Sequence, residues 1–567
     1  MVKQKENLYL QTKNNTGDNY NKMTQLTYKD FETLYQPLIS SNDAKRKLNL
    51  FYLVNGLPQN LKCHENPVYL AGGMPFESMF PVQEIDLQIR DNPGSLTDDQ
   101  VLSKNYSITK IKMYENEEKI KETESTKMIP VNSMIKGPSK VGLSYALQYS
   151  EVAGFPELLE LTRQIITRIN KPKYDMWDTL LTCGTSDSLA KICDMLIDDN
   201  STMLMEEFTF TPVLHNLQYS GGKHIPLKLN VTSDQSKQGI DPEYMSDLLD
   251  NFDKKYPGLQ KPKVLYTIAT GHNPTGLTQT MENRQKIYDI CSKHNIIIIE
   301  DDPYGYLQLP KYDESNPLNN PYSKGEISVD QYCKEILIPS YLTIDNDGRV
   351  LRCETFSKVG APGLRLGFIT GNKFLIDKLT KLTHLTVRNP SGVSQAVLTN
   401  MLIDMGQKYQ ALPGNENAPF IDGWIEWCMK ISGQYTTRRN YMFQSLYEQP
   451  AFKEKKFELI EPTCGMFFNT KIVLKPEWSK KETKRIMDYL YCCLLEEGCL
   501  AVLGYKMTID EDFSLERANF LRFTFAKANT EQLFKEGAER FSNAVERLFN
   551  EYGVDEKFDL APQGFVE

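Results

Sequence analysis

Short apolar runs alternate with stretches of helical periodicity in the middle of the chain. Residues 264–268 and 296–299 are apolar, rich in β-branched side chains and too short for a lone helix, so we expect two buried strands. Residues 281–295 between them carry apolar side chains at helical spacing, and another strand is expected from Val350 onward. Strand–helix–strand units in series predict an α/β fold with a mostly parallel sheet. Ligands in such folds bind beyond the carboxyl ends of the strands.

A lysine, Lys358, follows the strand expected from Val350 and begins a turn rich in glycine and proline. An ammonium group is costly to bury, so a strand-end lysine is poor core material. A buried, electropositive site would lower its pKa and so suit it to form a Schiff base. Thr355, Ser357 and Arg365 could hold a phosphate group through hydroxyl hydrogen bonds and a charge-assisted pair. The alternative is an exposed turn lysine without a chemical role.

Two further polar segments follow the other expected strands. Asp301 and Asp302 come just after the isoleucine run, where adjacent carboxylates are costly unless a cation needs them. A pyridinium ring is such a cation, and the phenol of Tyr304 could reach the 3-oxygen of that ring. The alternative is a solvated helix N-terminus, where acids are common. Asn273 lies in a turn after residues 264–268, which by itself indicates only a turn.

Composition narrows the class of protein further. The 567-residue chain has a net charge of −9 and no basic stripe, so we expect no nucleic-acid partner. No apolar run is long enough to cross a membrane, and the polar N-terminus lacks the features of a signal or transit peptide. The eleven cysteines and six histidines lack C-x-x-C and H-x-x-x-H spacing. We therefore expect reduced thiols, no bound metal and a cytoplasmic location.

The three polar segments together form a specific pattern. It consists of Asn273-Pro274-Thr275-Gly276, Asp301-Asp302-Pro303-Tyr304 and Ser357-Lys358 followed by Gly363-Leu364-Arg365 and Gly367. With this pattern the chain resembles the fold-type-I aminotransferases, and within them the fungal aromatic-amino-acid aminotransferases and the related 2-aminoadipate/kynurenine aminotransferases. The resemblance runs from about Ala71 to Ala528. It implies a large domain, whose mostly parallel central sheet lies between helices, and a smaller α/β domain built from both chain ends.

On this basis we expect four segments along the chain. Residues 1–25 form a flexible N-terminal segment. Residues 26–140 contribute the N-terminal part of the small domain, with a loop-rich polar insertion at about 92–128. Residues 141–411 form the large cofactor-binding domain, and residues 412–567 complete the small domain.

The resemblance implies pyridoxal 5'-phosphate (PLP) as the cofactor and gives the strand-end residues catalytic roles. Lys358 would carry the cofactor and act as base and acid of the proton shift between the substrate α-carbon and the cofactor. Asp301 would pair with the pyridinium nitrogen and keep it protonated, which makes the ring an electron sink. Tyr304 and Asn273 would hydrogen-bond the 3-oxygen of the ring, whereas Asp302 is not expected to touch the cofactor.

A phosphate site is implied around the same strand end. Thr355, Ser357 and Arg365 would hold the phosphate group together with Thr185 and Ser186. The last two residues precede a helical run, so their amides would offer a helix N-terminus to the anion. Gly184-Thr185-Ser186 could also be a simple helix N-cap, and the two interpretations can both hold.

The remaining site residues follow from the same resemblance. Phe210 would stack on the cofactor ring, with a core position as the alternative. Tyr149 would reach the phosphate of a neighbouring subunit, which implies a homodimer with shared active sites. Arg522 lies in an alternating, strand-like segment and would grip the substrate α-carboxylate, with a structural salt bridge as the alternative. Gly73 would belong to a segment that closes over the substrate, and Asn273 would also face the substrate.

The reaction implied is a ping-pong transamination. An aromatic L-amino acid (phenylalanine, tyrosine or tryptophan) gives its amino group, and a 2-oxo acid such as 2-oxoglutarate receives it. The alternatives are a 2-aminoadipate or kynurenine aminotransferase, a PLP-dependent lyase, and a transcription regulator with an aminotransferase-like ligand domain. Residues 1–70 show no basic recognition helix, which disfavours the regulator.

Overall fold

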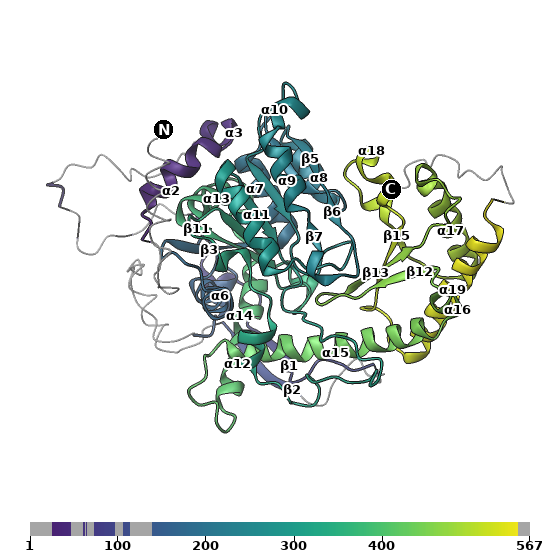
Figure 1. The fold of residues 1–567 in the computed structure, drawn as a ribbon. Coiled ribbons are helices and arrows are strands. Elements are labelled where there is room, and N and C mark those ends of the chain that lie inside the picture. Colours follow the sequence, from purple (N-terminus) through teal and green to yellow (C-terminus); the bar gives the residue numbers. More distant parts are fainter. Residues whose placement is uncertain are drawn as a thin grey trace, which may run out of the picture.

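The computed structural model of the chain describes residues 25–46, 60–62, 64, 68, 73–96, 106–113 and 139–553. The segment expected to be flexible, residues 1–25, lies outside the described residues except for residue 25. Within the described part, a seven-stranded sheet forms the centre of a large domain and a four-stranded sheet the centre of a smaller one (Figure 1).

The large sheet has the strand order β3-β11-β10-β9-β8-β4-β5. Neighbouring strands from β10 to β5 are parallel, and β11 is antiparallel to both β10 and β3. The strands span Trp177–Thr182 (β3), Thr202–Glu206 (β4), Lys223–Leu227 (β5), Val264–Thr267 (β8), Ile297–Asp301 (β9), Val350–Thr355 (β10) and Gly367–Asn372 (β11). The three strands expected from the apolar runs are β8, β9 and β10, and the mostly parallel α/β fold is confirmed.

Helices surround this sheet and bury apolar stripes against it (Figure 1). The predicted helix is α11 (Met281–His294), which begins after Thr280, whose hydroxyl accepts from the Asn283 amide at 3.1 Å. The others are α6 (Pro156–Ile169), α7 (Thr185–Leu196), α8 (Pro212–Tyr219), α9 (Pro242–Asp250), α13 (Lys373–Leu385) and α14 (Gly392–Gln410). Among the described helices, none combines the length and apolar character that a membrane span requires.

The small domain is an antiparallel sheet in the order β12-β13-β15-β14. Its strands are Phe457–Ile460 (β12), Phe467–Ile472 (β13), Val502–Leu503 (β14) and Phe520–Thr524 (β15). Two helices, α17 (Thr483–Glu497) and α19 (Glu531–Glu551), pack against each other beside it. The long helix α15 (Asp422–Tyr447) contacts α14 at one side and α19 at the other, so it links the two domains (Figure 1).

The N-terminal residues are arranged differently from the expected domain division. Helix α2 (Tyr28–Tyr35) packs on α13, and α3 (Ser41–Lys45) packs on α7. The hairpin of β1 (Glu84–Arg90) and β2 (Tyr106–Lys112) contacts α14 through β2. These described parts of residues 26–140 therefore lie on the large domain, where we expected them to add to the small domain.

Side-chain burial explains why α2 lies on the large domain and why a strand, β2, forms where a loop was expected. Phe31 and Tyr35 of α2 are fully buried, and the Tyr35 hydroxyl donates to the Asp347 carbonyl at 2.6 Å. These contacts hold the helix on the large domain. Strand β2 lies inside the range expected to be a loop-rich insertion, but its buried Thr109 and Ile111 alternate with exposed residues. That alternation is the period of a half-buried strand.

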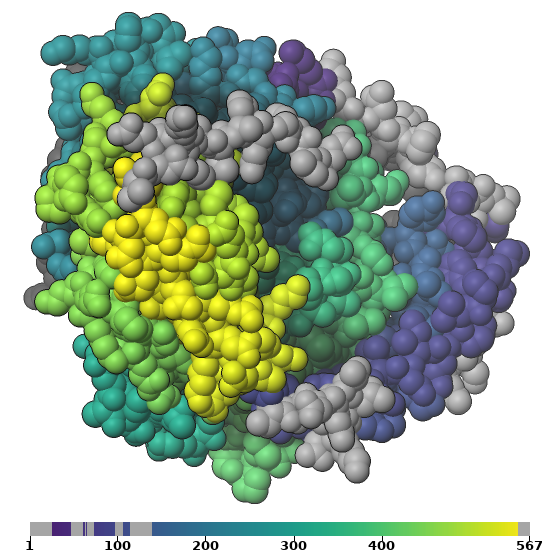
Figure 2. Space-filling model, turned by 90° about the vertical axis from the view of Figure 1, so that its right-hand side faces the viewer, coloured from purple at the N-terminus to yellow at the C-terminus, as the bar shows by residue number. Residues whose placement is uncertain are grey.

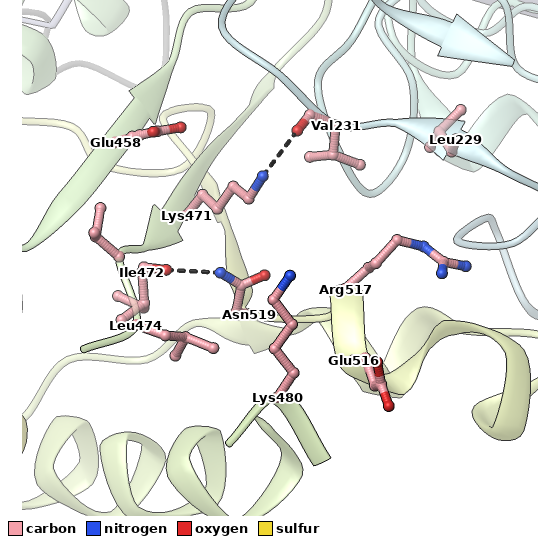
Figure 3. Close-up of a pocket in the computed structure, with 11 residues that line it drawn as sticks. Leu229, Val231, Glu458, Lys471, Ile472, Leu474, Lys480, Glu516, Arg517 and Asn519 are labelled. Atoms are coloured by element: carbon pink, nitrogen blue, oxygen red, sulfur yellow. Dashed lines mark hydrogen bonds between the residues drawn. The ribbon is translucent and has the colours of Figure 1, made fainter. Parts of the chain in front are cut away.

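A cavity of about 320 Å³ lies where the two domains meet (Figure 3). Leu229 and Val231 line it from the large domain, and Lys471 and Asn519 line it from the small domain. The Lys471 ammonium group donates to the Val231 carbonyl at 3.3 Å across this boundary. None of the site residues expected from the sequence lines this cavity. Figure 2 shows a hollow on the molecular surface between the yellow C-terminal residues and the green residues of the large domain.

Candidate active site

Asp301 ends β9, the strand between β8 and β10 in the large sheet. Its Oδ2 accepts a hydrogen bond from the hydroxyl of Tyr266 in β8 at 2.8 Å, and its Oδ1 is buried without a hydrogen-bond partner. Burial raises the pKa of the Asp301 carboxyl to about 7, while the hydrogen bond from Tyr266 acts in the opposite direction. One carboxylate oxygen is thus held in place, and the other is left for a donor that the chain does not supply.

Asp302 has a structural environment instead. Its carboxylate lies 2.7 Å from the guanidinium of Arg352 and accepts from the Gly305 amide, also at 2.7 Å. Arg352 also pairs with Glu300 at 3.2 Å, and both side chains are buried. Because side chains alternate along a strand, Glu300 and Asp301 point to opposite faces of the sheet. Asp301 and Asp302 therefore have different surroundings. Asp302 is bound by Arg352, whereas Asp301 keeps one carboxylate oxygen open.

Lys358 lies in the turn that directly follows β10. Helix α15 fixes this turn, because the Trp427 indole donates to the Val359 carbonyl at 2.8 Å and Trp424 packs on Phe356. The Lys358 side chain is half-buried, and burial lowers the pKa of its amine. The positive charge of Arg365 lowers this pKa further, which favours the neutral, nucleophilic amine.

The phosphate-site residues expected from the sequence come from three segments that meet beside Lys358. The Thr355 and Ser357 hydroxyls lie 2.8 Å apart, at the end of β10. Arg365 donates to the Cys183 carbonyl at 3.1 Å, which brings the guanidinium to the N-terminus of α7. Gly184 precedes that helix with a φ of 90°, and an added Cβ would lie 2.8 Å from Arg365. The positive φ, which L side chains rarely adopt, therefore favours glycine here.

Helix α7 begins at this point with the two predicted hydroxyl residues. The Thr185 hydroxyl is buried without a hydrogen-bond partner, and Ser186 is exposed. No side chain caps the first turn of α7. Its free amides and the Thr185 hydroxyl are therefore available to an anion, while Gly184 is the N-cap residue of the helix.

The small domain brings Arg522 to the same edge of the large sheet. Its guanidinium donates to Asn273 Oδ1 at 2.7 Å and lies over the ring of Phe467, 4.6 Å from the centroid. The Phe467 ring also contacts the ring of Tyr304 edge-on at 5.7 Å. Within the described residues, Arg522 forms no salt bridge with a carboxylate, and burial lowers its pKa. A half-buried guanidinium without an acidic partner is suited to an anionic ligand, which favours substrate binding over a structural salt bridge.

Three other predicted residues lie around this constellation. Phe210 follows β4 and is partly buried, whereas Phe208 is fully buried against Phe520 in the core. Tyr149 is 63% exposed and stacks with Arg388 at 5.7 Å. Gly73 is exposed, and no atom lies within 4 Å of the Cβ that it lacks. Within the described residues, neither Tyr149 nor Gly73 contacts the other predicted site residues.

Tyr266 and a buried cluster of hydrogen-bonded polar side chains around Glu206 were not predicted from the sequence. Glu206 in β4 accepts from Thr267 at 2.7 Å, and His272 lies 3.1 Å from the same carboxylate. These hydrogen bonds hold the turn that contains Asn273. Tyr266 and Thr267 stand in an apolar strand, so only the pairing of β8 with its neighbours reveals what their polar atoms contact.

The buried polar atoms left without partners fit a PLP molecule. Asp301 Oδ1 can accept from a protonated ring nitrogen, and the Thr185 hydroxyl with the α7 amides can bind a phosphate group. Lys358 has the lowered pKa that attachment of a carbonyl compound requires. The site therefore has the layout of an enzyme that binds PLP and an amino acid.

Comparison with known proteins defines the class. The family described as aminotransferase class I and II matches residues 142–541. The chain belongs to this family and is a PLP-dependent transaminase. The resemblance to fold-type-I aminotransferases is confirmed, as is the implied α/β fold with a large, mostly parallel sheet between helices.

Two relatives show how far the similarity extends. Aromatic amino acid aminotransferase 2 of Saccharomyces cerevisiae is 36% identical over 535 residues, which cover 93% of this chain and 98% of that protein. The mitochondrial kynurenine/alpha-aminoadipate aminotransferase of Bos taurus is 30% identical over 350 residues, which cover 57% of this chain and 75% of that protein. A crystal structure of an aromatic aminotransferase from Candida albicans superimposes with a TM-score of 0.78 at 38% identity and covers 91% of this chain and 98% of that chain.

Proposed function

We propose that this transaminase moves the amino group of an aromatic L-amino acid (phenylalanine, tyrosine or tryptophan) to a 2-oxo acid such as 2-oxoglutarate, in a ping-pong reaction. The similarity to the Saccharomyces protein along nearly the whole of both chains supports the substrate class. The reaction is supported by the position of Lys358, Asp301 and Arg522 at the same edge of the sheet. Arg522 is the observation that carries the proposal, because its guanidinium bonds Asn273 and has no acidic partner among the residues that the structure describes.

Each side chain has a defined task in this proposal. Arg522 binds the substrate α-carboxylate through two parallel hydrogen bonds, and Asn273 orients the guanidinium. Lys358 moves a proton from the substrate α-carbon to the cofactor in the first half of the reaction, and it moves a proton in the reverse direction, onto the α-carbon of the 2-oxo acid, in the second half. Asp301 holds a proton on the ring nitrogen of PLP, and Tyr304 lies next to Asn273 to bind the 3-oxygen. When bound, PLP supplies an electron sink for the carbanion.

The other predicted contacts are part of the same proposal. Thr355, Ser357 and Arg365 bind the phosphate group together with Thr185 and Ser186. Their convergence at the start of α7 supports this role. Phe210 stacks on the ring, which its partly buried place after β4 allows. Gly73 lies in the segment that closes over the substrate, and this role stays a prediction.

A panel of amino donors tests the substrate class. We expect kcat/KM to be at least tenfold higher for phenylalanine, tyrosine and tryptophan than for 2-aminoadipate and kynurenine, with 2-oxoglutarate as acceptor. The Bos taurus relative makes a 2-aminoadipate or kynurenine aminotransferase the second candidate. Equal or higher kcat/KM for either of those donors would overturn the aromatic assignment.

We also propose that the enzyme is a homodimer in which Tyr149 reaches the phosphate site of the partner subunit. Tyr149 is exposed, and Gln148 beside it donates to the Pro75 carbonyl at 2.8 Å. That bond brings an exposed apolar segment next to Tyr149, with Phe76 60% and Met79 76% exposed. Exposed large apolar side chains close together in the chain are suited to contact with a protein partner. The cytoplasmic location expected from the sequence stays a prediction.

A further inference from the structure

We infer that Tyr266 is the positioning residue for Asp301: its hydroxyl fixes Oδ2 and so leaves Oδ1 as the oxygen that holds the proton of the PLP ring nitrogen. This inference rests on the PLP chemistry of the family and is independent of which amino acid is the donor. It assigns a task to a tyrosine inside an apolar strand, where a phenylalanine would satisfy packing alone.

The strand register places the two side chains on one face of the sheet. Tyr266 in β8 pairs with Ile299 in β9, two residues before Asp301, so all three side chains share a face. The 2.8 Å bond runs between side chains that are 0% and 3% exposed. Within the described residues, Asp301 is the only hydrogen-bond partner of the Tyr266 hydroxyl.

The remaining neighbours of Asp301 leave its second oxygen open. Cys353 lies opposite Asp301 on the other adjacent strand, β10, and a thiol is a weak donor. Asp302 is held by Arg352 on the other face. Torsion about the last bond of an aspartate is soft, so a lone carboxylate could present either oxygen. The tyrosine hydrogen bond removes that freedom and holds the buried Oδ1 in one place.

The same hydrogen bond influences the charge of the carboxyl group. Burial raises the pKa of Asp301, and the negative charges of Asp302 and Glu206 raise it further. The Tyr266 hydrogen bond is the largest influence that lowers it, followed by the charge of Lys358. A phenylalanine at this position would therefore leave more Asp301 neutral near pH 7, and a neutral acid pairs poorly with a pyridinium cation.

The test measures binding of PLP to cofactor-free protein, without any amino acid. We expect Tyr266→Phe to weaken PLP binding about tenfold or more near pH 7, since hydrogen bonds to charged groups contribute about 1.5–3 kcal/mol. The acid limb of the binding–pH curve should move to higher pH. In the holoenzyme, kcat should fall while KM for the amino donor stays within about twofold, because ground-state substrate binding is not touched.

A matched control separates this effect from the loss of a buried hydroxyl. Tyr35 is also fully buried, and its hydroxyl donates to one carbonyl that precedes β10, at the opposite end of that strand from Lys358. Tyr35→Phe should therefore leave PLP affinity and its pH dependence unchanged. If Tyr266→Phe behaves like Tyr35→Phe, the inference is overturned.

A double mutant tests whether Tyr266 acts through Asp301. We expect Tyr266→Phe to have no further effect on PLP affinity in an Asp301→Asn background. An equal loss in both backgrounds would show that the hydroxyl acts elsewhere. If Tyr266→Phe does not fold, difluorotyrosine at position 266 provides the second variant. Its more acidic phenol is a stronger donor, so it should shift the binding–pH curve to lower pH, and a shift in the other direction would contradict the inference.

Discussion

At the scale of single residues, the site distinguishes two neighbouring carboxylates by their partners. Asp302 is paired with Arg352, whereas Asp301 has one hydrogen-bonded oxygen and one open oxygen. The sequence indicated this division only through the resemblance. The residue that enforces it on Asp301, Tyr266, could not be found, because its hydroxyl meets the carboxylate across two paired strands, 35 residues away in the chain. Polar contacts of this kind depend on strand pairing and leave no local pattern.

The raised pKa of Asp301 leads to a prediction about stability. The carboxyl pKa is about 7 in the folded chain and about 3.9 in an unfolded one. Between these values the folded state binds the proton more tightly, so the contribution of this group to the free energy of unfolding falls as the pH rises. Asparagine is neutral throughout. We therefore expect the change in the free energy of unfolding caused by Asp301→Asn to be more favourable at pH 8 than at pH 4.5. The expected difference for the cofactor-free protein is roughly 1–3 kcal/mol.

Urea denaturation of both cofactor-free proteins at the two pH values checks this prediction. The amide introduced by the substitution has a similar energetic cost at both pH values. Subtracting the stability change at one pH from that at the other therefore removes this cost. A stability difference that does not change with pH, or that changes in the opposite direction, would contradict a raised pKa. The same substitution should abolish transamination, because the ring nitrogen loses its anionic partner.

At the scale of elements, the site is an assembly of strand ends and the turns that follow them. Periodicity predicted β8, α11, β9 and β10, since each is determined by a short local pattern. The hairpin of β1 and β2 was not predicted, and the placement of α2 was not either, because both depend on contacts with helices hundreds of residues away. The conformation of the turn after β8 also depends on distant contacts, because the small domain packs directly on it.

Gly276 tests the packing of that turn. It has a φ of 70°, and an added Cβ would lie 2.7 Å from the Phe467 carbonyl of β13. We expect Gly276→Ala to destabilise the protein by about 2–4 kcal/mol, through backbone strain and the clash together. It should also lower kcat/KM, because the turn carries Asn273, which orients Arg522.

Gly258 provides the matched control. It has a φ of 83° but no atom within 4 Å of an added Cβ. Gly258→Ala therefore carries the backbone strain alone, about 1–2 kcal/mol, and should leave kcat/KM unchanged. Denaturant unfolding and steady-state kinetics of both variants give the comparison. Equal losses of activity in the two variants would rule out the contact between the turn and β13 as the cause.

At the scale of the whole molecule, the two domains contribute different parts of one site. The large domain carries Lys358 and Asp301, the small domain carries Arg522, and α15 spans both. The sequence predicted the two-domain plan through the resemblance, but not that residues 28–45 pack on the large domain. Tyr149 is 63% exposed, and among the described residues it does not contact the predicted phosphate site of its own chain.

Subunit complementation tests the shared site. We expect Lys358→Ala and Tyr149→Ala homodimers each to lose most of their activity. A hybrid dimer, isolated through a different tag on each chain, contains one site with both defects and one intact site. It should therefore recover about half of the wild-type activity per dimer. A hybrid no more active than the average of its two parents would mean that Tyr149 does not complete the partner's site.

The central claim is that Lys358 carries the cofactor, and chemical trapping tests it most directly. Borohydride reduction of the purified holoenzyme converts a Schiff base between lysine and PLP into a stable secondary amine, which peptide mass spectrometry can locate. We expect one phosphopyridoxyl group per chain, attached to Lys358, and no visible aldimine absorbance in the Lys358→Ala variant. A stoichiometric label on a different lysine, or no label on a catalytically active enzyme, would contradict the account.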